Sequence, residues 1–140
     1  MAAPAPRAKS VQARIVLMTA GSEEQATRIA RVLVDERLAA CVNVVGPIRS
    51  IYRWRHAVED QGEYLLLAKT RAALCARLEQ RVKQLHSYEL PEVLAISPSS
   101  GSARYLEWIA ESTRSESENA AARRAPGKKR RTRKVPPRGK

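Results

Sequence analysis

Apolar residues near the start of the chain change from a strand-like to a helical spacing. The run from Arg14 to Thr19 is short, apolar and rich in β-branched residues, which predicts a buried strand. Ser22 then precedes two acids and Gln25, a pattern typical of a capping box at a helix N-terminus. The apolar residues that follow recur at helical spacing, so we expect this first helix to end at about Leu38.

The next segment has the pattern of a long β-hairpin. Cys41–Val45 is a second apolar run, and Gly46-Pro47 interrupts it because proline cannot donate to a strand ladder. Alternation then resumes through Trp54. Asp60-Gln61-Gly62 predicts the turn, and Glu63–Lys69 predicts the third strand.

Helical spacing returns in the second half of the chain. A second helix is expected from Arg71, with Thr70 as its N-cap, because apolar residues recur at helical spacing as far as Leu85. A proline-containing segment breaks this pattern. Glu92–Ser97 then predicts a fourth strand, and Ser102–Thr113 predicts a last, short helix.

The predicted order of elements is βαββαβα, which indicates an α+β fold. Two βαβ-like halves that share one antiparallel sheet give the ferredoxin-like, split βαβ layout, with the two helices on one face. The strands carry apolar residues on both faces, namely Ile15, Leu17, Val42, Val44, Leu65 and Leu67. One layer of helices covers only one face, so the second face predicts oligomerisation.

Charge divides the chain into three parts. The formal net charge is +12, of which residues 1–13 contribute +2, residues 14–113 contribute +1 and residues 114–140 contribute +9. From Arg114 onward there is no Leu, Ile, Met or aromatic residue, so this segment has little apolar surface to bury. We therefore predict a disordered arm over 1–13, one folded domain over 14–113 and a disordered basic tail over 114–140.

Several classes of protein do not fit the sequence. The start has no apolar run typical of a secretory signal, although a transit peptide is an alternative for its Ala/Pro/Arg/Ser-rich composition, and no window approaches the roughly 18 apolar residues of a membrane span. We expect a cytoplasmic protein with reduced thiols and no membrane partner. The chain lacks the GxGxxG, Walker A, HExxH, CxxC and GxSxG motifs, so we expect no enzyme of a familiar class and no organic cofactor.

Some residues are able to bind soft or borderline metal ions. They are Met18, Cys41, His56, Cys75 and His86. Thiolates and thioethers suit Cu(I), and imidazole suits copper or zinc, but the spacing here matches no recognised metal site. Structural roles are the alternative: a buried thiol for Cys41, and a cation at a helix C-terminus for His86.

Arginine and aromatic residues alternate in Ser50-Ile51-Tyr52-Arg53-Trp54. Aromatic residues on a strand usually pack in a core or an interface. Stacking on nucleic-acid bases is the alternative, and the near-neutral charge of the domain argues against it.

Five segments occur in a characteristic order along the predicted domain. They are Leu38-Ala39-Ala40-Cys41-Val42-Asn43, Ser50-Ile51-Tyr52-Arg53-Trp54, Lys69-Thr70, Leu85-His86-Ser87-Tyr88-Glu89-Leu90-Pro91-Glu92 and Tyr105-Leu106-Glu107-Trp108-Ile109. In these segments the chain resembles the CutA divalent-cation-tolerance proteins. The resemblance covers nearly all of 14–113, and several segments in register are more specific than one motif.

The resemblance implies a ferredoxin-like homotrimer with a role in tolerance of copper and other divalent ions. It implies that Cys41, His86 and Glu89 are candidate metal ligands, and that Tyr52, Trp54 and Tyr88 line clefts between subunits. Three positions depart from the family pattern: Ser87 replaces a proline, His56 replaces a glycine that often follows the tryptophan, and Met18 replaces a first-strand cysteine of some members.

The basic tail lies outside the resemblance. Its densest part carries Lys128, Lys129, Arg130, Arg131, Arg133 and Lys134. Such a run binds nucleic acid or another polyanion through counterion release, without sequence specificity. A nuclear localisation signal and a solvated extension without a partner are the alternatives.

The sequence thus supports two main hypotheses. The first is a trimeric metal-response protein that binds copper or a similar ion at inter-subunit clefts. The second is a trimeric signalling or scaffold module whose clefts bind a small ligand or a protein partner, with the tail contacting a polyanion.

Overall fold

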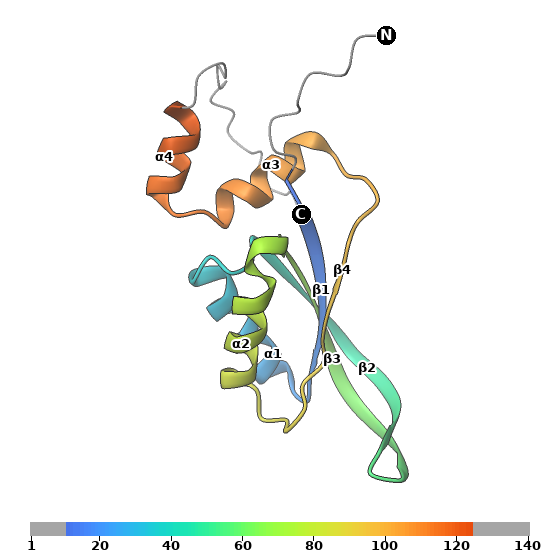
Figure 1. Ribbon diagram of the computed structural model, residues 1–140. Coiled ribbons are helices and arrows are strands. Elements are labelled where there is room, and N and C mark those ends of the chain that lie inside the picture. The colour runs from blue at the N-terminus through green and yellow to red at the C-terminus, as the bar shows by residue number, and fades with distance from the viewer. Residues whose placement is uncertain (1–10, 125–140) are drawn as a thin grey trace.

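The computed structural model describes residues 11–124 (Figure 1). Its elements are β1 (Ala13–Ala20), α1 (Glu23–Asp35), β2 (Cys41–Trp54), β3 (Ala57–Arg71), a 3-10 turn (Ala72–Leu74), α2 (Cys75–Leu85), β4 (Val93–Ile96), α3 (Ala103–Ser112) and α4 (Glu116–Arg124). This order confirms the predicted βαββαβ unit with a C-terminal helix and adds α4. Residues 1–10 and 125–140, which include most of the predicted arm and the whole basic run, lie outside the described residues.

The four strands form one antiparallel sheet in the order β2-β3-β1-β4. Helices α1 and α2 lie on the same side of this sheet, α3 crosses one end, and the β2–β3 hairpin projects from the other end (Figure 1). The arrangement confirms the ferredoxin-like fold. Within residues 11–124, no helix is long and apolar enough to cross a lipid bilayer.

The main core lies between the sheet and the two helices. Its largest fully buried side chains are Val16, Met18, Ile29, Leu33, Leu66, Thr70, Leu78 and Val82. Burial of the aliphatic side chains contributes about 1.5–3 kcal/mol each before the loss of conformational entropy is counted. The alternation that predicted the strands and the helical spacing that predicted α1 and α2 both converge on this layer.

Helix α1 begins as predicted but ends earlier. The Ser22 side chain accepts a hydrogen bond from the Gln25 N–H at 3.2 Å, which caps the first turn. The expected end at Leu38 is wrong, because Arg37 takes a left-handed conformation with φ 60° and ends the helix after Asp35. The Leu38 N–H then turns back to the carbonyl of Leu33 at 2.9 Å.

The turn of the long hairpin lies at Arg55 and His56, and not at Asp60-Gln61-Gly62 as predicted. Both turn residues have positive φ values, 45° and 71°, and they join Trp54 directly to Ala57. The predicted turn residues are part of β3. There the Arg49 guanidinium donates to Asp60 at 2.7 Å across the two strands, raising the pKa of Arg49 and lowering that of Asp60.

A bulge in β2 shifts the register between Val45 and Ile48, at the predicted Gly46-Pro47 interruption. A Cβ atom at Gly46 would lie 2.4 Å from the Tyr64 ring, so only glycine fits beneath that ring. The bulge adds one residue to β2. Before the bulge, odd-numbered residues of β2 therefore share a face with odd-numbered residues of β3. After the bulge, even-numbered residues of β2 share a face with odd-numbered residues of β3.

The sheet face that α1 and α2 leave uncovered, called here the open face, is largely apolar. Strand pairing places on it Ile15, Leu17, Thr19, Cys41, Asn43, Val45, Leu65, Leu67, Lys69, Leu94 and Ile96. The exposed fractions of Leu94, Ile96 and Val45 are 59%, 48% and 44%. Helix α3 covers only the end of this face, where Ile109 packs with Ala13 and Ala40. The prediction of apolar residues on both faces is confirmed.

The disorder predicted from residue 114 is wrong for Glu116–Arg124, which form α4. A capping box begins this helix: the Glu118 N–H donates to the Ser115 hydroxyl at 3.2 Å, and the Ser115 N–H donates to the Glu118 carboxylate at 3.1 Å. The Asn119 amide donates to a carbonyl of α3 at 2.9 Å. Local capping and alanine content thus form a helix that burial of large apolar residues would not have predicted.

Thr70 is not the N-cap of α2. It lies fully buried in β3, and its hydroxyl donates to the Leu38 carbonyl at 2.7 Å. The first turn after β3 is instead the 3-10 segment, which has no side-chain cap. Thr70 therefore ties the residue after α1 to the sheet.

We expect Thr70→Val to lower the free energy of unfolding by about 1–3 kcal/mol, because the buried Leu38 carbonyl loses its partner while the side-chain volume is kept. Urea unfolding at one fixed protein concentration measures the change. Thr27→Val on the exposed side of α1 is the control, with little expected change. Equal effects of the two substitutions would show that the buried hydrogen bond is not what matters.

Candidate functional site

The predicted metal ligands do not form one cluster within the chain. Among residues 11–124, no group of three or more His, Cys, Asp or Glu side chains is placed to hold a metal ion. Cys41 lies on the open face, opposite Lys69, and its Sγ atom is 3.9 Å from the Asn43 side-chain oxygen. Its thiol is therefore part of the surface that a second subunit would cover.

His86 is committed to the fold. Its Nε2 lies 2.7 Å from the Thr19 carbonyl, and its Nδ1 accepts the Tyr88 N–H at 3.1 Å. Because Nδ1 accepts the Tyr88 N–H, Nε2 is the nitrogen that donates to the Thr19 carbonyl. The residue is only 9% exposed. Neither nitrogen is available to a metal ion unless one of these hydrogen bonds breaks.

Cys41 and His86 belong to different ends of the sheet. Cys41 pairs with Lys69 in β3, whereas Thr19, the partner of His86, pairs with Leu65. These β3 positions are four residues apart, which is about 13 Å along a strand. One metal ion cannot contact both side chains of the same subunit in this conformation.

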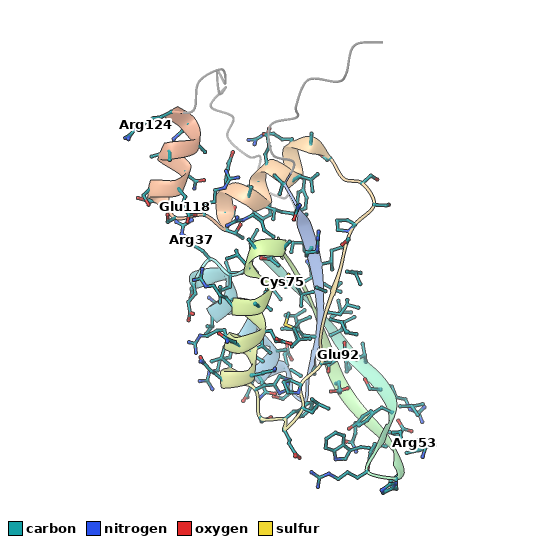
Figure 2. All side chains as sticks on the ribbon, in the orientation of Figure 1. Arg37, Arg53, Cys75, Glu92, Glu118 and Arg124 are labelled. Carbon is teal, nitrogen blue, oxygen red and sulfur yellow. The ribbon has the colours of Figure 1, made fainter. Side chains whose placement is uncertain are left out.

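Glu89 lies beside the outer part of the hairpin. Its carboxylate accepts a hydrogen bond from Arg55 at 2.6 Å, and both side chains are largely exposed. The Arg55 guanidinium also lies 5.2 Å from the centre of the Trp54 ring. Figure 2 shows Glu92 beside the sheet and Arg53 farther out along the hairpin. An exposed ion pair of this kind stabilises little, so Glu89 remains accessible.

The predicted cleft residues Tyr52, Trp54 and Tyr88 do gather in one region. Tyr52 and Trp54 lie on the same face of the hairpin, because both are even-numbered residues after the bulge. Tyr88 precedes Glu89, whose ion pair with Arg55 brings the segment after α2 to the hairpin beside Trp54. The three residues are 36–41% exposed. They are called here the aromatic cluster.

Glu63 is the functional candidate that sequence reasoning missed. It is only 5% exposed, and the Tyr88 hydroxyl donates to its carboxylate at 2.9 Å. Gly21 allows this contact, since a Cβ atom there would lie 2.9 Å from the Tyr88 oxygen. Glu63 opens a predicted strand, so the sequence pattern gave no sign that its side chain would be buried.

The Tyr88 phenol stays protonated over the physiological pH range. Burial, together with the hydrogen bond and the negative charge of Glu63, raises the pKa of Tyr88 to about 12. The hydroxyl therefore remains a donor to Glu63. The His86 ring lies beside it, tilted by 48°, with ring centres 4.5 Å apart, so the segment after α2 is held at both its backbone and its side chains.

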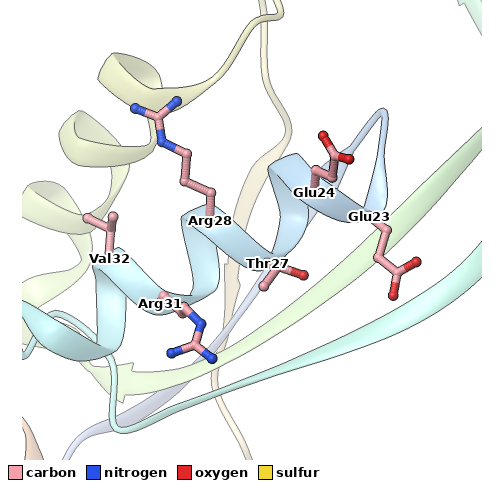
Figure 3. Close-up of a pocket in the computed structure, with 6 residues that line it drawn as sticks. All are labelled: Glu23, Glu24, Thr27, Arg28, Arg31 and Val32. Carbon is pink, nitrogen blue, oxygen red and sulfur yellow. The ribbon is translucent and has the colours of Figure 1, made fainter.

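Two other features do not act as sites. Cys75 lies on α2 against the core, where burial raises the pKa of its thiol, so it is less reactive than an ordinary cysteine (Figure 2). A shallow depression on α1 is lined by Glu23, Glu24, Thr27, Arg28, Arg31 and Val32. Figure 3 shows these side chains spreading outward from one helix, so they cannot surround a ligand.

Comparisons with known proteins agree with the sequence segments quoted above. The model of the family described as CutA1 divalent ion tolerance protein matches residues 14–112. The divalent-cation tolerance protein CutA of Thermus thermophilus is 48% identical over 99 residues, covering 71% of this chain and 96% of that protein. The chloroplastic protein CutA of Arabidopsis thaliana is 42% identical over 106 residues, which are 76% of this chain and 58% of that longer protein.

The fold agrees as well. The crystal structure of CutA1 from Oryza sativa superposes with a TM-score of 0.74 at 40% sequence identity, covering 76% of this chain and 98% of that chain. The regions shared with these proteins contain the open face and the aromatic cluster.

We expect a spectrophotometric titration of the tyrosines to contain one step at about pH 12 that Tyr88→Phe removes. Because folding raises the pKa of Tyr88 from 10.0 to about 12, its contribution to stability is complete below pH 10 and is lost as the pH rises to about 12. The difference in free energy of unfolding between wild type and Tyr88→Phe should shrink over this interval. A difference that stays constant would contradict the assignment.

Proposed function

This chain belongs to the CutA1 divalent ion tolerance protein family, and on that premise we propose that it acts in the tolerance of, or response to, divalent metal ions. We propose further that it acts as a homotrimer, that copper is the preferred ion, and that the metal binds at clefts between subunits. The observation that carries this proposal is the position of Cys41 on the open face.

The open face supports self-association. A patch containing Leu94, Ile96 and Val45, each at least 44% exposed, is unusual on a small monomer and typical of an interface. The long hairpin supports it too, because within residues 11–124 β2 pairs with β3 alone and leaves one edge for a neighbouring chain. Every copy of the chain carries the same apolar face and the same strand edge, as a closed, symmetric homo-oligomer requires.

Metal binding then depends on residues from more than one subunit. A thiolate suits Cu(I), and Cys41 is the one cysteine on the open face. His86 is held by two hydrogen bonds and is a weaker candidate, whereas Glu89 is accessible beside the hairpin. We propose that Cys41 of one subunit meets donors of another, so that assembly completes the site.

The proposed role is one of binding and not of catalysis, and the proposed compartment is the cytoplasm. Neither cysteine forms a disulfide within the described residues, which supports a reducing setting. Plant relatives bear the word chloroplastic in their names, so location varies among relatives.

A second candidate function is a signalling or scaffold module that binds a small ligand or a protein partner. The aromatic cluster favours it, because three partly exposed rings converge from two segments while His86 is engaged in the fold. In this case Tyr52, Trp54 and Tyr88 matter more than Cys41.

The tail would add a partner to either function. We propose that the basic run from Lys128 to Lys134 contacts nucleic acid or another polyanion without sequence specificity. Three tails on one trimer would raise the avidity. Its residues lie outside those that the structure describes, so the support is the charge alone.

We expect the full chain to bind copper in competition with a chelator, and Cys41→Ser to weaken this binding at least tenfold. Titration under reducing conditions measures it, beside a zinc titration. Cys75→Ser is the matched control, because its thiol packs against the core and should not contribute. Equal copper binding by wild type and Cys41→Ser would refute the direct role of Cys41 and favour the second candidate.

The tail should control any binding to DNA. Full-length protein is expected to bind a duplex with an affinity that falls steeply with salt, whereas a chain ending after Arg124 should bind much more weakly and with a smaller salt dependence. Fluorescence anisotropy at several salt concentrations measures both. Ending the chain there keeps α4 intact. Similar binding by the two chains would exclude the tail as the polyanion site.

A further inference from the structure

Three arginines from separate elements meet where α3 ends and α4 begins. The Arg71 guanidinium, at the end of β3, donates to the hydroxyl and to the carbonyl of Thr113 at 2.8 and 3.1 Å. The Arg37 guanidinium, from the segment after α1, donates to the carbonyl of Arg114 at 3.1 Å. Thr113 and Arg114 are consecutive residues, whose Cα atoms lie about 3.8 Å apart. Two guanidinium groups are thus held beside a third arginine, and the three are called here the arginine cluster.

The arginine cluster has an excess of positive charge. Within residues 11–124 none of its three members forms an ion pair, and the hydrogen bonds of Arg37 and Arg71 go to uncharged oxygen atoms. Burial and the charge of Arg114 lower the pKa of Arg71, whereas Glu118 raises it. The Glu118 carboxylate is itself engaged, because it accepts the Ser115 N–H at 3.1 Å. One carboxylate therefore acts on a cluster of three guanidinium groups.

Arg37 occupies a backbone position that favours glycine. Its φ of 60° is left-handed, and the Leu38 N–H after it returns to the Leu33 carbonyl, a pattern in which helices commonly end with glycine. An arginine in this conformation costs stability, and what it provides in exchange is its side chain. Backbone strain of this kind is frequent at functional sites, so it supports a role for the Arg37 guanidinium.

An anion can reach the arginine cluster from solvent. Arg37 is exposed, Arg71 and Arg114 are half-buried, and Ser115 beside them is exposed. Figure 2 shows Arg37 and Glu118 at this junction, on the outside of the molecule. A guanidinium group has five N–H donors in a planar fork that matches pairs of phosphate oxygens. Arg71 uses two of these donors within the fold and Arg37 uses one, so several remain for a ligand.

We propose that Arg37, Arg71 and Arg114 bind a small molecule that carries phosphate groups, with pyrophosphate as the simplest example. A multiply charged phosphate suits the cluster because its oxygen atoms can accept from more than one guanidinium group at once. The family model matches as far as residue 112, so Arg114 and Glu118 lie beyond the matched region. The proposed site is independent of the copper proposal and separate from the basic run Lys128–Lys134.

Calorimetric titration of the full-length protein with pyrophosphate at physiological ionic strength tests the proposal. Within residues 11–124 the Arg114 side chain forms no ion pair, so Arg114→Gln removes charge without breaking one. We expect this substitution to weaken pyrophosphate binding about tenfold, since hydrogen bonds to charged groups are the stronger ones. Arg31→Gln, at an exposed arginine of α1, makes the same change of charge and is the matched control, which should bind like wild type.

Glu118→Gln should have the opposite effect. Glutamine serves in a capping box as glutamate does, so the start of α4 is kept, while the carboxylate that acts on Arg71 is removed. We expect pyrophosphate to bind several times more tightly to this variant. Glu24→Gln, at an exposed acid of α1, is its control and should bind like wild type. A loss of folding would not move Arg114→Gln and Glu118→Gln in opposite directions.

Three outcomes would overturn the proposal. Equal binding by wild type and Arg114→Gln would exclude the arginine cluster and assign any binding to the basic tail, which both proteins carry. Equal losses in Arg114→Gln and Arg31→Gln would show that net charge alone matters. Binding of duplex DNA that falls in Arg114→Gln, with no binding of pyrophosphate to wild type, would assign the arginines to a nucleic-acid surface and refute the small ligand.

Discussion

Covering the sheet from one side only is the constraint on which the rest of this structure depends. Helices α1 and α2 bury one face around Met18 and Leu66, and α3 reaches only the end of the other face. Leu94 and Ile96 are thereby left in contact with water at a cost of roughly 25 cal/mol for each Å² of apolar surface. Self-association would remove that cost, and it would also bring Cys41 into an interface between subunits.

A second constraint acts where the segment after α2 joins the hairpin. His86 holds that segment to β1, and Tyr88 holds it to Glu63 in β3. These contacts use polar atoms that could otherwise bind a metal ion. Residues that suggest a metal site in the sequence are therefore engaged in hydrogen bonds that stabilise the fold. Burying a carboxylate without a cationic partner generally costs stability, and Glu63 has no ion pair among residues 11–124. Functional sites commonly keep such a residue at the expense of stability, which is why it is a stronger candidate than the exposed Glu89.

Where a prediction from the sequence was wrong, the structure was determined either by contacts within a few residues or by contacts between distant segments. The hairpin turned at Arg55 and His56, two residues that carry no turn signal, because pairing along fifteen residues of β3 fixed the register beyond the expected turn. Thr70 was taken for a helix cap by its place before α2, but its hydroxyl is used by Leu38, which is 32 residues away in sequence. Helix α4 was missed because its stability comes from capping and alanine and not from apolar burial.

The sequence by itself determined the order of the elements, the antiparallel ferredoxin-like sheet, the apolar character of both sheet faces and membership of the family, because periodicity and short motifs are local properties of the chain. It also determined that Tyr52 and Trp54 share a face. Tertiary structure alone decided that His86 is engaged by Thr19, 67 residues earlier, that Glu63 is buried beneath Tyr88, and that Cys41 lies far from both. Those outcomes depend on which distant segments meet, and no local pattern records that.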